Sequence, residues 1–148
     1  MDDLAQWLGE QLDEDERIAR AATPGPWHVR DDGVVGDDGD HWPVAYTDSH
    51  RAGEDCLYIA EHDPVRALRE VDAKRRILAP CVAALEERPA IRARMRELIY
   101  KEPDEFARLH REENRLIEVA ESLAPVVALL ALPYADRPGY REEWALPG

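Results

Sequence analysis

A group of cationic side chains carries the clearest chemistry in this sequence. His62, Arg66 and Arg69 stand at the start of a predicted helix, where backbone N–H groups and the helix dipole favour an anion. Trp27 and Trp42 could line the same place and stack on a planar ring. Together these five residues would bind a phosphate group or a nucleotide.

An ordinary solvated surface is the alternative interpretation of the same helix. Arg66 and Glu70 are four residues apart, and Arg69 and Asp72 are three apart. This is the spacing of ion pairs on one helix face. Because such exposed pairs are common and contribute little, we favour them over the pocket.

Donor atoms for a metal ion gather in one short stretch. His41, His50, Cys56 and His62 offer imidazole and thiolate groups, which zinc prefers. Their spacing matches none of the regular metal-binding patterns, such as CxxC or HExxH. We therefore expect no metal ion and no other cofactor.

Two acidic pairs have a spacing that could hold Mg²⁺. Glu102 with Glu105 and Glu118 with Glu121 stand three residues apart, so each pair shares one helix face. With 32 Asp and Glu residues in the chain, such pairs arise by chance, and no nucleophilic triad accompanies them. The sequence favours a protein without catalytic activity.

The charge balance limits the classes of partner that the chain could bind. The 148 residues include 19 Lys and Arg against 32 Asp and Glu, a formal charge of −13. Nucleic acid and anionic membrane surfaces would be repelled. A protein with a basic surface stays open as a partner, and solubility alone is the plainer reason for the charge.

Cysteines and apolar runs bear on location. Cys56 and Cys81 are the two cysteines, and free thiols suit a reducing compartment. The longest apolar run, Val126–Leu132, is too short to span a bilayer, and no leader-like segment opens the chain. We expect a cytoplasmic protein that does not contact membranes.

The first half alternates helix, sheet and helix. Apolar spacing predicts a helix over 3–22, which the prolines of 24–26 end. Alternating residues and Asp-Gly turns predict an antiparallel meander over 27–47, and a short helix follows over 53–61. Asp63-Pro64 then predicts a new helix, with a carboxylate cap and proline in the first turn.

Prolines divide the second half into shorter predicted helices. Pro80 should kink or restart the helix that starts at Pro64, and Pro89 and Pro103 should mark further breaks or starts. Apolar stripes over 90–124 predict a charged helical hairpin, whose exposed seam could pair two copies of the chain. A short helix over 126–132 would follow Pro125, and the tail would form one turn.

These elements predict an α+β fold: a small antiparallel three-stranded sheet packed on a helical bundle, with a central helical hairpin. We expect one domain over 1–148, with a helix–meander–helix core over 1–80, the hairpin insertion over 81–124, and a C-terminal helix and tail over 125–148. The predicted core is Leu8, Leu12, Trp27, Val29, Val44, Ile59, Leu68, Val71, Leu78, Leu129 and Leu132.

Several motifs together resemble an uncharacterised family of short actinobacterial and actinophage proteins. They are ATPGPW at 22–27, AEHDP at 60–64, LALPYAD at 130–136 and YREEW at 140–144. The resemblance implies no known activity, but it and the arrangement of the first half, similar to phage accessory proteins, imply a mobile-element origin.

The resemblance covers about residues 1–80 and 126–146, and this chain departs from the family between them. Relatives carry a short Cys/His-rich segment suggestive of zinc, whereas residues 82–124 hold no cysteine and only His110.

Three functions follow from these observations. The favoured one is a non-enzymatic accessory or regulatory protein that binds another protein. The alternatives are a nucleotide or phosphate binder at the five residues named first, and a Mg-dependent nucleotide hydrolase on the acidic helices.

Overall fold

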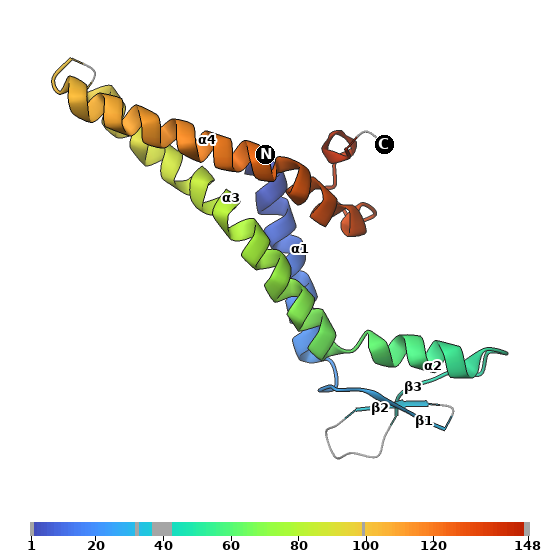
Figure 1. The fold of residues 1–148 in the computed structure, drawn as a ribbon. Helices are drawn as coiled ribbons and strands as arrows, with labels where there is room; N and C mark the ends of the chain where they lie inside the picture. Colours follow the sequence, from blue (N-terminus) through green and yellow to red (C-terminus); the bar gives the residue numbers. More distant parts are fainter. Residues whose placement is uncertain (1, 32, 37–42, 99, 147–148) are drawn as a thin grey trace. The chain divides into compact units, whose positions relative to one another are not determined.

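The computed structural model describes residues 2–31, 33–36, 43–98 and 100–146 (Figure 1). It confirms the α+β class. The elements follow in the order α1 (Asp2–Ala21), β1 (His28–Arg30), β2 (Gly33–Val35), β3 (Pro43–Tyr46), α2 (Ala52–Glu61), α3 (Pro64–Leu98), α4 (Pro103–Ala131) and two 3₁₀ turns, η1 (Leu132–Tyr134) and η2 (Glu142–Trp144).

Residue contacts divide the chain into two compact units. Unit 1 comprises residues 1–11 and 74–148, and unit 2 comprises residues 12–73. The helices α1 and α3 each belong partly to both units. We describe each unit by itself, and a single domain over 1–148 stays a prediction.

Unit 2 is built on the three-stranded sheet and α2. The strands lie in the order β1-β2-β3, antiparallel throughout, with Val29 opposite Val34. The central strand supplies Val34 and α2 supplies Cys56, and both side chains are fully buried. The Thr47 hydroxyl lies 3.5 Å from the Cys56 sulfur. The sheet therefore packs on α2.

Unit 1 is dominated by an antiparallel helical hairpin formed by α3 and α4 (Figure 1). An ion pair between Arg92 and Glu113 joins the two helices. Buried apolar residues line the inner faces of both: Leu78, Cys81, Ala84 and Leu98 on α3, and Leu109, Leu116, Ala120 and Val127 on α4.

The predicted breaks at Pro89 and Pro125 are wrong, and the helix does not restart at Pro80. Pro80 and Pro89 lie inside α3, and Pro125 lies inside α4, so 126–132 is not a separate helix. All three prolines are exposed, so water can bond the carbonyls that lose their amide partners. Pro103 does begin a helix, as predicted.

The predicted core is correct in part. Val29, Leu129 and Leu132 are wrong, with exposures of 39%, 54% and 44%. Near the end of α4 the buried face carries Val127 and the small residues Ala128 and Ala131 instead. Of the predicted residues the described structure buries Leu8, Leu12, Val71 and Leu78, and half-buries Trp27, Val44, Ile59 and Leu68.

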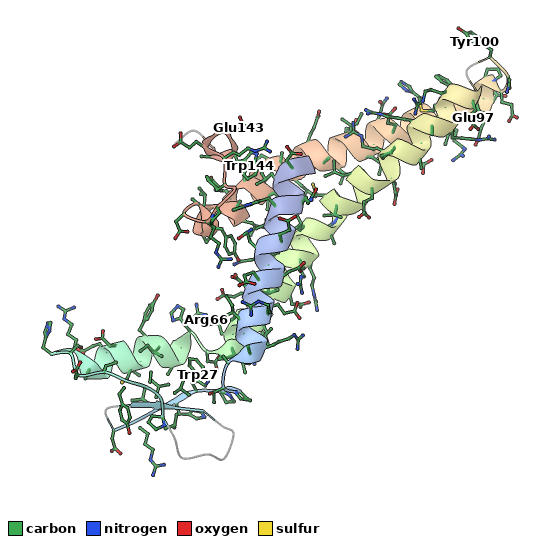
Figure 2. All side chains as sticks on the ribbon, turned by 180° about the vertical axis from the view of Figure 1, so that it is seen from behind. Trp27, Arg66, Glu97, Tyr100, Glu143 and Trp144 are labelled. Carbon is green, nitrogen blue, oxygen red and sulfur yellow. The ribbon has the colours of Figure 1, made fainter. Side chains whose placement is uncertain are left out.

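The C-terminal tail of unit 1 closes over the start of α1. The indole N–H of Trp7 donates to the carbonyl of Pro138 at 3.1 Å. The rings of Tyr140 and Trp144 lie 5.6 Å and 5.4 Å from the Trp7 ring. Figure 2 shows Trp144 on the predicted short turn of the tail, η2. The tail thus covers a tryptophan that is 8% exposed.

Part of α4 is more apolar than its longest uninterrupted run indicates. Among the described residues, the stretch Pro103–Tyr134 contains an 18-residue window with a mean hydropathy of 1.8, of which 28% is buried. By length and composition such a helix could cross a membrane, contrary to the expectation from Val126–Leu132 alone. A single helix of this kind is weak evidence for a membrane span. The same helix also pairs with α3 through Glu113.

Candidate functional site

The start of α3 is organised by one buried carboxylate. Asp63 is 8% exposed. One of its oxygens accepts the backbone N–H of Arg66 at 2.7 Å, and the other accepts the backbone N–H of Trp27 at 3.1 Å. The first bond is the predicted helix cap. The second ties the chain that enters the sheet to the start of the helix.

The corner before the sheet is shaped around this carboxylate. A Cβ on Gly25 would stand 2.7 Å from an Asp63 oxygen, so a side chain there would displace the cap. The indole N–H of Trp27 donates to the carbonyl of Thr23 at 2.9 Å, and the ring is half-buried. Packing accounts for the corner without a ligand.

Contacts within the protein occupy the side chains that were predicted to form an anion pocket. Arg66 donates to Glu70 at 2.9 Å and to the carbonyl of Glu61 at 3.2 Å, and the bond to Glu70 raises the pKa of Arg66. His62 is exposed and stacks on the Tyr58 ring at 4.2 Å.

An anion at this helix start would meet the negative charge of Asp63, so the geometry favours the ion-pair interpretation. Figure 2 shows Trp27 and Arg66 near this helix start. Arg69 is exposed, and Trp42 lies outside the described residues.

The other sets of candidate ligands are dispersed or paired. Among the residues that the structure describes, no group of three or more metal-ligating side chains converges. His41 lies outside that part, His50 is exposed and Cys56 is buried. Glu105 accepts two bonds from Arg108, at 2.8 Å and 2.7 Å, which lower its pKa.

A groove on the distal part of the hairpin was not predicted. It has a volume of about 540 Å³ and is lined by Arg92, Met95 and Arg96 of α3 and by Phe106 of α4. Met95 and Phe106 are half-buried, and both arginines are exposed. The imidazole of His110 lies parallel to the Phe106 ring at 6.3 Å. The groove thus combines apolar walls with two guanidinium groups.

The two arginines differ in their partners. Arg92 pairs with Glu113, whose side chain is 10% exposed. The Nε atom of Arg96 donates to the carbonyl of Arg92 at 3.4 Å. Within the described ranges no carboxylate pairs with Arg96, so its charge faces the solvent.

The tip beyond the groove is exposed. Tyr100, labelled in Figure 2 together with Glu97, is 93% exposed. The chain therefore presents aromatic and apolar groups along the outer part of the hairpin.

The acidic total of the chain conceals the charge balance of this region. Residues 88–115 contain eight Arg and Lys against six Asp and Glu, a net charge of +2, whereas the other 120 residues carry −15. A count of charge by segment would have shown that residues 88–115 are close to neutral and that most of the excess negative charge lies elsewhere. The total of −13 averages the two.

Comparison with known proteins places this architecture in a family. Residues 1–146 match a family of unknown function, DUF6221. The chain belongs to this family. The match extends through residues 82–124, which the resemblance in the sequence had left out, so the hairpin lies within the region that defines DUF6221. No curated protein and no solved structure shows significant similarity to the chain.

Proposed function

We propose that this DUF6221 protein is a non-enzymatic accessory protein that binds another protein through the distal part of its helical hairpin. The observation that carries the proposal is the groove of about 540 Å³ lined by Arg92, Met95, Arg96 and Phe106. Partly exposed apolar side chains flanked by arginine are the composition of protein-binding surfaces.

The remaining predicted sites support other functions less well. The helix start at Asp63 already holds a carboxylate where a phosphate would bind. Glu105 of the acidic helices is held by Arg108. We therefore place binding of a protein ahead of nucleotide binding and hydrolysis. A regulatory role, a cytoplasmic location and a phage or mobile-element origin belong to the same proposal.

Photo-crosslinking in the native host tests the proposed function. A photoreactive phenylalanine analogue replaces Met95 or Phe106 in the groove, or Arg115 as a control on α4 away from the groove. We expect the two groove positions to give the same crosslinked protein and position 115 to give none of it.

Titration with the purified partner completes the test. Phe106→Asp should weaken binding at least about tenfold, because it places a charge among apolar contacts, and Arg115→Glu should leave binding within about twofold. Equal crosslinking at all three positions would overturn the proposal. A product with twice the mass of the chain would instead assign the groove to the predicted homodimer through residues 90–124.

A further inference from the structure

The lining of the groove points to the chemistry of the partner. We infer that the groove binds an acidic amphipathic helix of another protein. This inference rests on the proposed function and deepens it, because it specifies what the bound surface contains.

The apolar walls suit a helix. Arg92, Met95 and Arg96 are spaced i, i+3, i+4 and so lie on one face of α3. Phe106 forms the opposite wall from α4. A groove between two antiparallel helices accepts the apolar stripe of a third, which is a common mode of peptide recognition. The half-buried Met95 and Phe106 are then covered.

The cationic rim selects for acidic flanks. Arg92 already compensates Glu113, whereas Arg96 has no carboxylate partner among the described residues. A helix with Asp or Glu beside its apolar stripe would pair with Arg96, and one with Lys or Arg there would be repelled.

A second copy of the chain fits the groove less well. If a two-fold axis passed through the groove, Arg96 would face the same residue of the other copy. Charge complementarity therefore favours a different, acidic protein.

The composition of the chain allows a direct test on the full-length protein. Phe106 is the one phenylalanine, and Met95 is the one methionine besides Met1. Incorporated 4-fluorophenylalanine and ¹³C-methyl methionine therefore give NMR reporters inside the groove. The probe is a helical peptide of about 16 residues, with leucines at i, i+3, i+4 and i+7 and glutamates on both flanks. The control peptide has lysines in place of the glutamates.

We expect the acidic peptide to shift both signals and the lysine peptide to shift neither. The Kd should rise about tenfold between about 50 and 300 mM NaCl. Arg96→Glu should weaken binding about tenfold. Arg115→Glu makes the same charge change outside the groove and should have less than about a twofold effect. Circular dichroism verifies that both variants keep the helical content.

Three results would overturn the inference. They are equal shifts with both peptides, no shift at about 1 mM acidic peptide, and a dimer in sedimentation that Phe106→Asp dissociates. If the groove-specific crosslinks persist while the acidic peptide fails, the proposed function stands and only the partner chemistry falls. If the crosslinks fail as well, both fall.

Discussion

At the scale of single residues, Asp63 links two distant parts of unit 2. Its two oxygens bond the backbone of Arg66, three residues ahead, and of Trp27, 36 residues behind. The first contact was predictable, since Asp-Pro before an apolar stripe marks a helix start. The second depends on how the chain turns back in three dimensions, which local sequence does not encode.

Removing this carboxylate should destabilise unit 2. Asp63→Ala leaves two partly buried N–H groups without an acceptor, and we expect a loss of about 2 kcal/mol in the free energy of unfolding. Urea denaturation followed by tryptophan fluorescence measures it. Asp48→Ala, at an exposed position, is the control. Equal stability of both variants would contradict the role given to Asp63.

Two glycines of unit 1 should respond in opposite directions to alanine. Gly139 has φ +87°, and a Cβ there would stand 2.9 Å from the indole nitrogen of Trp7, so Gly139→Ala should cost about 1–3 kcal/mol. Gly9 lies inside α1 with open space around it. Gly9→Ala should therefore stabilise by about 0.5–1 kcal/mol. Thermal unfolding of the two variants provides the comparison, and a shift of the same sign in both would disprove it.

At the scale of elements, helix type was more predictable than helix length. The stripes over 64–85 and 106–123 correctly predicted helices, because packing on one face determines the period. Pro80, Pro89 and Pro125 did not interrupt α3 and α4. Both helices carry buried side chains close to these prolines: Cys81 and Ala84 in α3, and Val127 in α4. Their tertiary packing outweighs the local cost of proline.

The groove could not be predicted from local sequence, because it too depends on tertiary packing. Its residues come from two helices whose register is set by packing across the hairpin. Only the local charge balance was readable in advance, and the total charge concealed it.

The ion pair across the hairpin should be asymmetric in its two partners. Arg92→Ala leaves the largely buried carboxylate of Glu113 without a cation, and we expect a loss of about 2 kcal/mol. Glu113→Leu removes the buried charge and leaves the exposed Arg92 in water, so it should be close to neutral. Chemical denaturation of both variants decides this, and a larger loss for Glu113→Leu would contradict the expectation.

Acid should weaken the first turns of α4. Hydrogen bonds from Arg108 lower the pKa of Glu105 from its ordinary value of 4.5. A carboxylate with a depressed folded-state pKa stabilises the fold above its unfolded pKa and loses that contribution as pH falls through the folded value. Because the pair is exposed, the effect should be small and reduced by salt.

The measurement for this pair is the unfolding free energy as a function of pH. The stability difference between the wild-type protein and Glu105→Gln should be present near pH 6 and disappear below the ordinary carboxyl range. Glu118→Gln, at an exposed position on the same helix, is the matched control. A constant difference at all pH values would rule out the ion pair as the cause.

At the scale of the whole molecule, charge is divided unequally along the chain. Residues 88–115 carry +2 and the other residues −15. The excess negative charge of these other residues favours solubility.

Solubility should follow the total charge. Near the isoelectric point that the sequence predicts, about pH 4.7, the net repulsion between copies should vanish and the solubility should pass through a minimum. Turbidity measured from about pH 3.5 to 8 checks this. A minimum near neutral pH would show that the local charge of the hairpin, rather than the total, controls association.

The division into units also determines the order in which the chain can fold during synthesis. All of unit 2, residues 12–73, leaves the ribosome as one continuous segment, whereas unit 1 joins residues 1–11 to 74–148. Trp7 precedes its partner Pro138 by 131 residues, and its ring partners Tyr140 and Trp144 follow later still. The start of α1 must therefore wait with an uncovered tryptophan until residues 138–144 have been made.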